Sequence, residues 1–248
     1  MYPVIPRTLP TIKKVLILFV MILLLVSCNS SQNKPSDMND YFPLEKGRFW
    51  EYRVETNYTE TEPTYSSLRI ENIGKKTIGD QTFWVRRTSN GTDYYLRKDS
   101  DGVFRYGKRN IIEKHPSMDA NKRMVLPLPL PDRSGKSWSV LTQSYTIHRI
   151  LPNYEPPNEN IARFHMTYTL ESLDEEVTVP AGSFKKCLLI EGQAQIDQLV
   201  GANTGNGTIE MTTREWYAPG IGLVKLERIE PLDGEVFKGG KITLQLMK

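Results

Sequence analysis

The sequence predicts an all-β protein, built on an antiparallel sheet that curves strongly into an open barrel or folds into two packed sheets. Apolar and polar side chains alternate with a period of two in segments such as Phe49–Glu55 and Arg163–Glu171, which is typical of half-buried strands. Turn-forming dipeptides separate the apolar runs: Asn90-Gly91, Asp101-Gly102, Asn206-Gly207 and Asp233-Gly234. Beyond the N-terminal region no segment shows a convincing helical period, and only residues 112–123 favour a helical turn or two.

The N-terminal region has the features of a secretory signal helix. Arg7, Lys13 and Lys14 are the only charged residues before Cys28, and Val15–Val26 is an unbroken run of twelve apolar residues. A helix of that length spans roughly 18 Å, which is too short for a hydrocarbon core of about 30 Å. A positively charged stretch followed by such a run is typical of a signal peptide.

The apolar run ends at Leu25-Val26-Ser27-Cys28, which resembles the lipobox of bacterial lipoproteins. The resemblance implies that the Cys28 thiol takes a diacylglycerol, that the chain is cut just before it, and that the new amino group is acylated. We therefore expect residues 1–27 to be a lipoprotein signal peptide and Cys28 to be the lipid-attachment residue. The alternative is a signal anchor with an incidental cysteine.

A polar segment follows the cysteine, and we expect residues 28–40 to form a flexible tether. Asn29–Asn39 (NSSQNKPSDMN) is rich in Ser and Asn and shows no apolar periodicity. Such a segment averages roughly 20 Å end to end, and two or three acyl chains hold it durably on a membrane. By resemblance to enteric lipoproteins, Asn29 stands where an aspartate would retain the protein in the inner membrane. The expected location is the bacterial cell envelope, with the lipid anchor in the outer membrane and the domain facing the periplasm.

The second cysteine bears on whether the domain has a disulfide, and the net charge bears on whether it binds nucleic acid. If Cys28 carries lipid, Cys187 has no disulfide partner, although the compartment permits one. A disulfide between the two cysteines is the rival interpretation, and it leaves the lipobox unexplained. The net charge of +3 belongs to the signal, because its removal leaves 29 basic and 29 acidic residues. The mature chain therefore shows no electrostatic footprint for nucleic acid.

The mature chain contains internal sequence repeats, which favour a duplicated β unit. Three patterns recur in the same order: Pro43-x3-Gly47-x2-Trp50 with Pro131-x3-Gly135-x2-Trp138, Thr77-Ile78-x4-Phe83 with Thr178-Val179-x4-Phe184, and Gly102–Arg105 with Gly222–Lys225. We expect repeat-like halves at about 41–110 and 125–230 within a single β domain, residues 41–248. Coincidence among strand and turn residues is the alternative.

Between the halves, the alternating prolines of Val125–Pro131 (VLPLPLP) prevent a central strand and favour polyproline II. We expect a stiff crossover strap that buries Leu126, Leu128 and Leu130 on the domain. A docking ligand for another protein is the alternative.

Three motifs resemble a widespread group of uncharacterised bacterial lipoproteins and periplasmic proteins. They are Tyr41-Phe42-Pro43-Leu44 with Gly47 and Trp50, Val179-Pro180-Ala181-Gly182-x-Phe184 with Cys187, and Trp216-Tyr217-Ala218-Pro219-Gly220-Ile221-Gly222-Leu223-Val224. The similarity runs from about Tyr41 to Glu230 and implies an extracytoplasmic antiparallel β domain. It brings no catalytic residue, because the motifs consist of turns and core aromatics. It also implies that Cys187 is a packed thiol.

The sequence holds no familiar catalytic motif, so we expect a protein that is not an enzyme and uses no cofactor. It lacks a G-x-S-x-G, an H-E-x-x-H, a P-loop and an EF-hand pattern. If Gln143–Ile150 pairs with Arg163–Leu170, His148 lies opposite His165, but no third metal ligand is visible. We therefore expect a polar or solvated histidine pair and no metal site.

Three classes of function fit these expectations. The first is a membrane-anchored envelope lipoprotein whose non-catalytic β domain binds or scaffolds another envelope component. The alternative is a carrier or receptor for an apolar or lipid ligand on a curved sheet, and the third class is a hydrolase. A large apolar cavity open to solvent would favour the carrier, and a filled core would favour the scaffold. We expect Trp50, Trp138 and Trp216 to be largely buried in such a core.

Replacing the predicted lipid-attachment residue tests the lipoprotein interpretation. Because the lipid bond needs the thiol, Cys28→Ser should abolish metabolic labelling with a radioactive or clickable fatty acid and leave an uncleaved precursor. Electrophoresis of labelled cells measures both effects. A Cys28→Ser chain that is processed and labelled as before would show that the interpretation is wrong.

Overall fold

The computed structural model describes residues 40–150, 163–201 and 205–248, and in these ranges every regular element is a β-strand. The strands are β1 (Phe49–Tyr58), β2 (Thr64–Ile78), β3 (Gln81–Thr88), β4 (Asp93–Asp99), β5 (Gly102–Arg109), β6 (Ser117–Pro127), β7 (Ser137–Thr142), β8 (His148–Arg149), β9 (Phe164–Val179), β10 (Gly182–Gly201), β11 (Gly205–Ala218), β12 (Gly222–Asp233) and β13 (Phe237–Leu246). This confirms the predicted all-β class. The helical turn expected within residues 112–123 is wrong, because β6 begins there and pairs with β5. No helix long and apolar enough to cross a membrane occurs in the described ranges.

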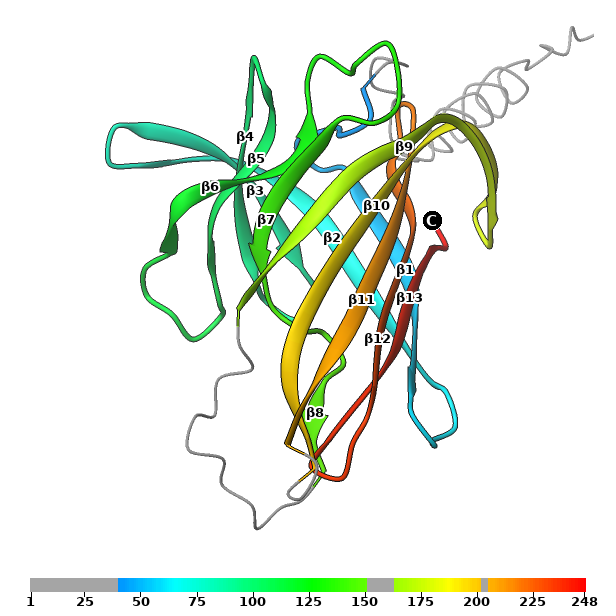
Figure 1. The fold of residues 1–248 in the computed structure, drawn as a ribbon. Helices are drawn as coiled ribbons and strands as arrows, with labels where there is room; N and C mark the ends of the chain where they lie inside the picture. Colours follow the sequence, from blue (N-terminus) through cyan, green and yellow to red (C-terminus); the bar gives the residue numbers. More distant parts are fainter. Residues whose placement is uncertain (1–39, 151–162, 202–204) are drawn as a thin grey trace, which may run out of the picture. The chain divides into compact units, whose positions relative to one another are not determined.

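The strands form one antiparallel sheet that contains two successive six-stranded meanders (Figure 1). Its order is β6-β5-β4-β3-β2-β1-β13-β12-β11-β10-β9-β7, and the short β8 pairs with β13 beside this path. The pairing of β1 with β13 joins the meanders, whereas β6 and β7 are the two edges of the sheet. These edges approach each other, since Arg123 Nη1 in β6 donates a hydrogen bond to the Leu141 carbonyl in β7 at 2.7 Å. The sheet is therefore nearly closed into a barrel, with one unpaired seam between β6 and β7.

The echoes in the sequence fall at equivalent points of the two meanders. Trp50 is the second residue of β1, and Trp138 is the second residue of β7. The second echo spans the turn from β2 to β3 and the turn from β9 to β10, and the third echo opens β5 and β12. Gly102 and Gly222 both have positive φ at these openings, +159° and +98°, where a side chain would be strained. The β6–β7 seam is thus the counterpart, in strand order, of the paired junction between β13 and β1.

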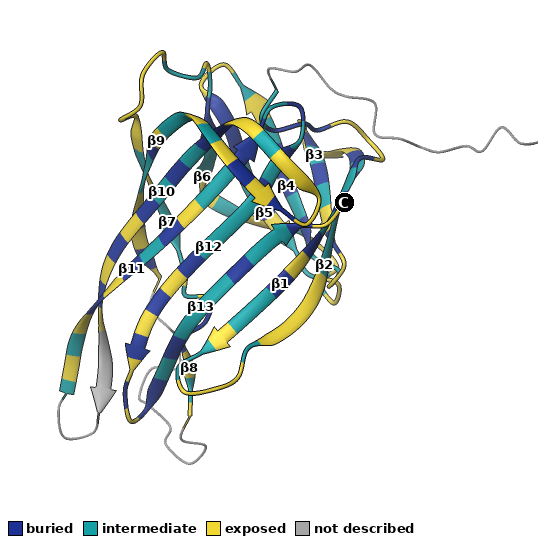
Figure 2. Cartoon of the chain, turned by 90° about the vertical axis from the view of Figure 1, so that its right-hand side faces the viewer, coloured by how far each residue is buried: buried dark blue, intermediate teal, exposed yellow. Residues whose placement is uncertain are grey.

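Burial alternates along the strands and places an apolar core on the inner face of the sheet (Figure 2). Core residues with essentially no exposed surface come from both meanders: Tyr95, Val103, Leu126, Met166, Leu170, Leu188, Met211 and Val224. The expected strap, Val125–Pro131, is correct only in part. Its first three residues end the edge strand β6, in which Leu126 and Pro127 pair with β5, whereas Leu128 and Leu130 pack on the same apolar cluster as Leu126, as expected. The interior of the described part of the barrel is therefore largely filled with side chains.

The three tryptophans do not share one environment. Trp50 is 4% exposed and packs in the core, as expected. Trp138 and Trp216 are less completely buried, but each packs against a core cluster, so the expected packing is confirmed for all three. Trp138 lies on the edge strand β7, which has no paired neighbour on its seam side. Trp216 alternates with the buried Tyr217 and so points to the other face of the sheet, where the Lys225 ammonium lies 4.8 Å from its ring centroid.

A buried ion pair on β12 holds the loop between β7 and β8. Arg228 and Glu230 on β12 are 1% and 0% exposed, and Arg228 Nε lies 2.7 Å from Glu230 Oε1. The Glu230 carboxylate also accepts hydrogen bonds from the loop between β7 and β8, which are given by Ser144 Oγ at 2.6 Å, by Thr146 N at 2.7 Å and by the amides of Tyr145 and Ile147. One carboxylate therefore fixes this loop across the end of the sheet.

The hydrogen bonds to Glu230 also set its ionisation. Burial by itself raises the pKa of a carboxyl, but the Ser144 hydroxyl, the Arg228 charge and the backbone donors reverse this and hold the Glu230 pKa below its usual range. A lowered pKa in the folded state contributes stability above the unfolded-state pKa of about 4.3. That contribution is lost as the pH falls through the folded-state pKa.

Glu230→Gln should strongly destabilise the protein. The substitution leaves Arg228 buried without its counter-charge, and breaking a buried pair in this way costs about 3–5 kcal/mol. The free energy of unfolding, measured by chemical denaturation at pH 7, checks this value. Glu176→Gln is the control, because the side chains of Glu176 and its partner Lys185 are 59% and 77% exposed and an exposed pair contributes less than about 1 kcal/mol. Equal losses in the two variants, or an unchanged fall in stability below pH 4.3 in Glu230→Gln, would contradict this role.

Cys187 should behave as an inert core residue. It has no exposed surface in the cluster that contains Trp50 and Val224. Burial, aided by the Glu175 carboxylate, raises its thiol pKa to about 11, so little thiolate forms at neutral pH. In a Cys28→Ser chain, where it is the single thiol, Cys187 should resist iodoacetamide at pH 8 and react fully in denaturant. Mass spectrometry measures the adduct, and rapid labelling of the native chain would contradict burial.

Candidate functional site

The residue predicted to carry lipid lies outside the described ranges. Cys28 and the signal peptide of residues 1–27 belong to that part of the chain, as does the tether except for its last residue, Asp40. The lipid attachment at Cys28 therefore stays a prediction. The candidate site described below is in the β domain.

The structure separates the two histidines that were expected to face each other. Strand β9 pairs with β7, which sets His165 opposite Leu141, and His148 in β8 pairs with Lys238 in β13. His148 instead packs edge-on against the Tyr58 ring, with 4.6 Å between the ring centroids. The predicted register is wrong because β9 pairs with β7, which ends at Thr142, and not with the segment Gln143–Ile150. Among the described residues no group of three or more His, Cys, Asp or Glu side chains is arranged to hold a metal ion.

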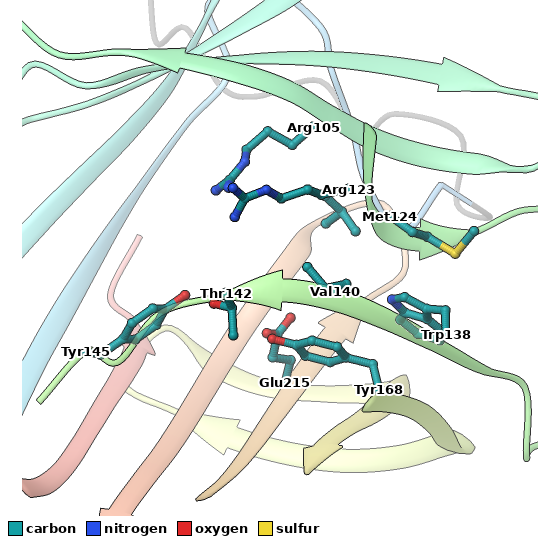
Figure 3. Close-up of a pocket in the computed structure, with 10 residues that line it drawn as sticks. Arg105, Arg123, Met124, Trp138, Val140, Thr142, Tyr145, Tyr168 and Glu215 are labelled. Carbon is teal, nitrogen blue, oxygen red and sulfur yellow. The ribbon is translucent and has the colours of Figure 1, made fainter. Parts of the chain in front are cut away.

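The seam between β6 and β7 contains a pocket (Figure 3). The cavity measures about 130 Å³. Its walls come from β5, β6, β7, β9 and β11 and from the loop after β7, and they are Arg105, Arg123, Met124, Val125, Trp138, Val140, Thr142, Tyr145, Tyr168 and Glu215. We call this cavity the seam pocket. Segments far apart in the sequence thus meet where the sheet fails to close.

One wall of the seam pocket is aromatic. Strand register places Trp138 directly opposite Tyr168, and their rings stack with centroids 5.9 Å apart and planes 13° apart. Tyr145 completes this side, held by its backbone bond to Glu230 and by the Arg228 guanidinium, which lies 4.1 Å from its ring centroid. Figure 3 shows the three rings on the side of the pocket that faces away from β5 and β6. Flat rings of this kind present a surface for apolar or planar groups.

The opposite wall is cationic. Arg105 in β5 and Arg123 in β6 occupy opposed positions of the strand pair, and Figure 3 shows both side chains projecting into the pocket. They share one carboxylate, since Asp119 Oδ1 lies 2.9 Å from Arg123 Nη2 and its Oδ2 lies 3.6 Å from Arg105 Nε. At 3.6 Å the latter pair makes no hydrogen bond, and both atoms are buried without any hydrogen-bond partner in the described structure. The wall therefore carries an excess positive charge and an unused donor.

Glu215 forms the inner part of the pocket. Its Oε2 accepts a hydrogen bond from the Tyr217 hydroxyl at 2.6 Å. Burial raises the Glu215 pKa, and this outweighs the Tyr217 hydrogen bond and the charge of Arg228, which lower it. The protonated form of Glu215, which can donate a hydrogen bond, is therefore favoured more than in an exposed glutamate.

Two wider depressions adjoin the seam pocket. They measure about 330 and 360 Å³, and Arg123 lines both of them as well as the pocket. The further basic residues in their walls are Lys108, Lys122 and Arg163. The three spaces together form what we call the seam cleft, whose walls combine basic and aromatic side chains.

A serine and a histidine meet in the wall of the cleft, but they do not make a catalytic arrangement. Ser139 Oγ lies 3.1 Å from His165 Nδ1, and both side chains are exposed. No carboxylate among the described residues orients the His165 ring, and such a third group is part of the geometry that activates a nucleophilic serine. The chemistry that this site supports is binding of an anion with an apolar part.

Sequence reasoning identified only part of this site. Trp138 stood out through the repeat, and Tyr168 through the alternation of its strand. Arg105, Arg123 and Glu215 were missed, because lone charged residues in alternating strands are typical of a solvated face. An available signal was that Glu215 directly precedes Trp216 and lies two residues before Tyr217 in the same strand, so its side chain faces the same side of the sheet as Tyr217.

Comparison with known proteins gives three findings. A family model described as DUF3108-like matches residues 165–232, the stretch from β9 to β12. No curated protein matches the chain. Two solved structures are similar in outline. One is a presumed lipoprotein of Parabacteroides distasonis, with 13% identity and a TM-score of 0.36, and the match covers 86% of this chain and 99% of that one. The other is a presumed exported protein of Bacteroides fragilis with a YmcC-like fold, with 14% identity and a TM-score of 0.34, and the match covers 84% of this chain and 97% of that one. Similarity at this level decides neither the fold nor the function of the present chain.

Proposed function

We propose that this chain is a lipid-anchored protein of the bacterial cell envelope whose β domain binds another envelope component at the seam cleft, without catalysing a reaction. The observation that carries the proposal is the seam itself. In the described sheet, β6 and β7 are the two edge strands and do not pair with each other. The cleft between them is lined by cationic, acidic and aromatic side chains. Unpaired edges and convergent polar groups are features of binding surfaces.

The filled interior favours this proposal over a carrier of long acyl chains. A binding site for a drug-sized ligand has a volume of roughly 300–1,000 Å³, whereas the seam pocket measures about 130 Å³. The adjoining depressions measure about 330 and 360 Å³, and the charged side chains of Asp119 and Arg163 stand in the walls of both. Such a surface suits a polar or charged partner, with only a small apolar group of that partner entering the barrel wall.

The Cys28 lipobox supports the envelope location. A lipid anchor with a short tether would keep the domain within roughly 20 Å of a membrane surface. A binding domain held in this way meets its partner at a high effective concentration. The outer membrane, facing the periplasm, is the proposed place.

Photo-cross-linking in cells tests the proposed function. A photoreactive amino acid replaces Met118, which is 42% exposed and lines the cleft, or Tyr65, which is 63% exposed on β2 away from it. Irradiation should give one discrete adduct from position 118 and none from position 65, identified by mass spectrometry of the envelope fraction. Equal patterns at the two positions, or no adduct at position 118, would overturn the proposal. Saturable binding of a fluorescent long-chain fatty acid to the purified protein would support the carrier instead.

A further inference from the structure

We propose that the seam pocket binds a small organic anion, with its carboxylate or phosphate against Arg105 and Arg123 and one ring-sized apolar group against Trp138 and Tyr168. The proposal rests on the proposed function, because it assigns the ligand chemistry of the same cleft. The cationic wall would recognise the charged group of this ligand, and the aromatic wall would recognise its apolar group.

The charge balance of the cationic wall is the first support. Arg105 and Arg123 oppose each other in the β5–β6 pair, and Asp119 is the acidic group that contacts both. Like charges opposed across two strands destabilise a sheet, so this pair is costly without a further anion. A bound carboxylate or phosphate would supply the missing negative charge.

The available donors point to Arg105 as the main anchor. Arg123 already donates to the Leu141 carbonyl at 2.7 Å and to Asp119 at 2.9 Å. Arg105 contacts Asp119 at 3.6 Å and lies 5.6 Å from the Tyr94 ring centroid, and its Nε is buried without a hydrogen bond in the described structure. A guanidinium in this state can give two parallel hydrogen bonds to a carboxylate or phosphate.

The size and lining of the pocket define the apolar part of the ligand. A dry cavity of roughly 150 Å³ holds one benzene molecule, and the seam pocket is of about that size at 130 Å³. The stacked rings of Trp138 and Tyr168 offer a flat face to a ring or a short branched chain. Glu215 at the inner end has a raised pKa through burial, so its repulsion of an anion is weaker than that of an ordinary carboxylate. Asp119 remains the acidic group that opposes binding.

The basic side chains around the seam pocket would attract such an anion to the cleft. Lys108 and Arg163 are exposed in its walls, and Lys122 lies at its edge. A cleft lined mainly with one sign of charge raises the local concentration of ions of the opposite sign.

Calorimetric titration of the full-length purified protein tests this ligand class. Phenyl phosphate should bind with one site per chain, and inorganic phosphate and benzyl alcohol, which each carry half of the recognised chemistry, should bind at least about tenfold more weakly. Arg105→Gln should weaken phenyl phosphate by at least about tenfold and leave benzyl alcohol unchanged. Arg53→Gln, which removes an exposed guanidinium from β1, should change either affinity by less than about twofold.

A filled pocket provides a second test that does not depend on the arginines. Val140→Trp places a ring in the cavity and should abolish phenyl phosphate binding in a protein that melts as one cooperative unit. No saturable binding of phenyl phosphate to the wild-type protein, equal affinity for benzyl alcohol, or an unaffected Arg105→Gln variant would each overturn the proposal. If phenyl phosphate fails but the position 118 adduct forms, the ligand class is wrong and the binding function stands; if both fail, the binding function is wrong as well.

Discussion

The buried carboxylate of Glu230 holds the loop between β7 and β8 against the inside of the sheet, and the geometry of the seam depends on that contact. The loop folds inward because five donors from Ser144 to Ile147 converge on this one group. Removing a carboxylate from water is costly unless its hydrogen bonds are replaced and its charge is balanced. Arg228 balances the charge, and its guanidinium in turn supports the Tyr145 ring at the end of the seam pocket. The polar core is therefore the scaffold of the aromatic wall.

The seam follows from the way the two meanders are joined. Strands β1 and β13 meet along seven paired positions, so that junction is continuous sheet. The other junction is crossed by the strap after β6, whose prolines supply no backbone donor for a ladder. Arg123 crosses the gap with a side chain where a backbone hydrogen bond would otherwise be. In a domain assembled from two similar units, one junction can thus be continuous sheet that stabilises the fold, as between β1 and β13, while the other leaves a cleft, as between β6 and β7.

Local patterns in the sequence predicted the fold class well, and long-range register poorly. Alternation identifies a strand and its buried face from neighbouring residues alone, which is why Trp50, Tyr52 and Val54 were assigned correctly. The partner of a strand is decided by the whole sheet. The predicted pairing of His148 with His165 does not form, because β9 pairs with β7 instead. The cationic wall depends on two such pairings and on irregular registers within β5 and β6. Alternation in a single strand therefore could not bring Arg105 and Arg123 together.

The adjacency of β1 and β13 has a consequence for the order in which the chain could be connected. The amide of Glu51 bonds to the Lys248 carbonyl at 2.9 Å, so the first and last strands run side by side at this end of the sheet. Termini that lie close together tolerate circular permutation. A chain cut in the exposed stretch between Asp132 and Lys136, and closed by a linker from β13 to β1, would keep both meanders contiguous. Its new ends would then lie at the seam, where a tag or a fused domain would stand beside the cleft.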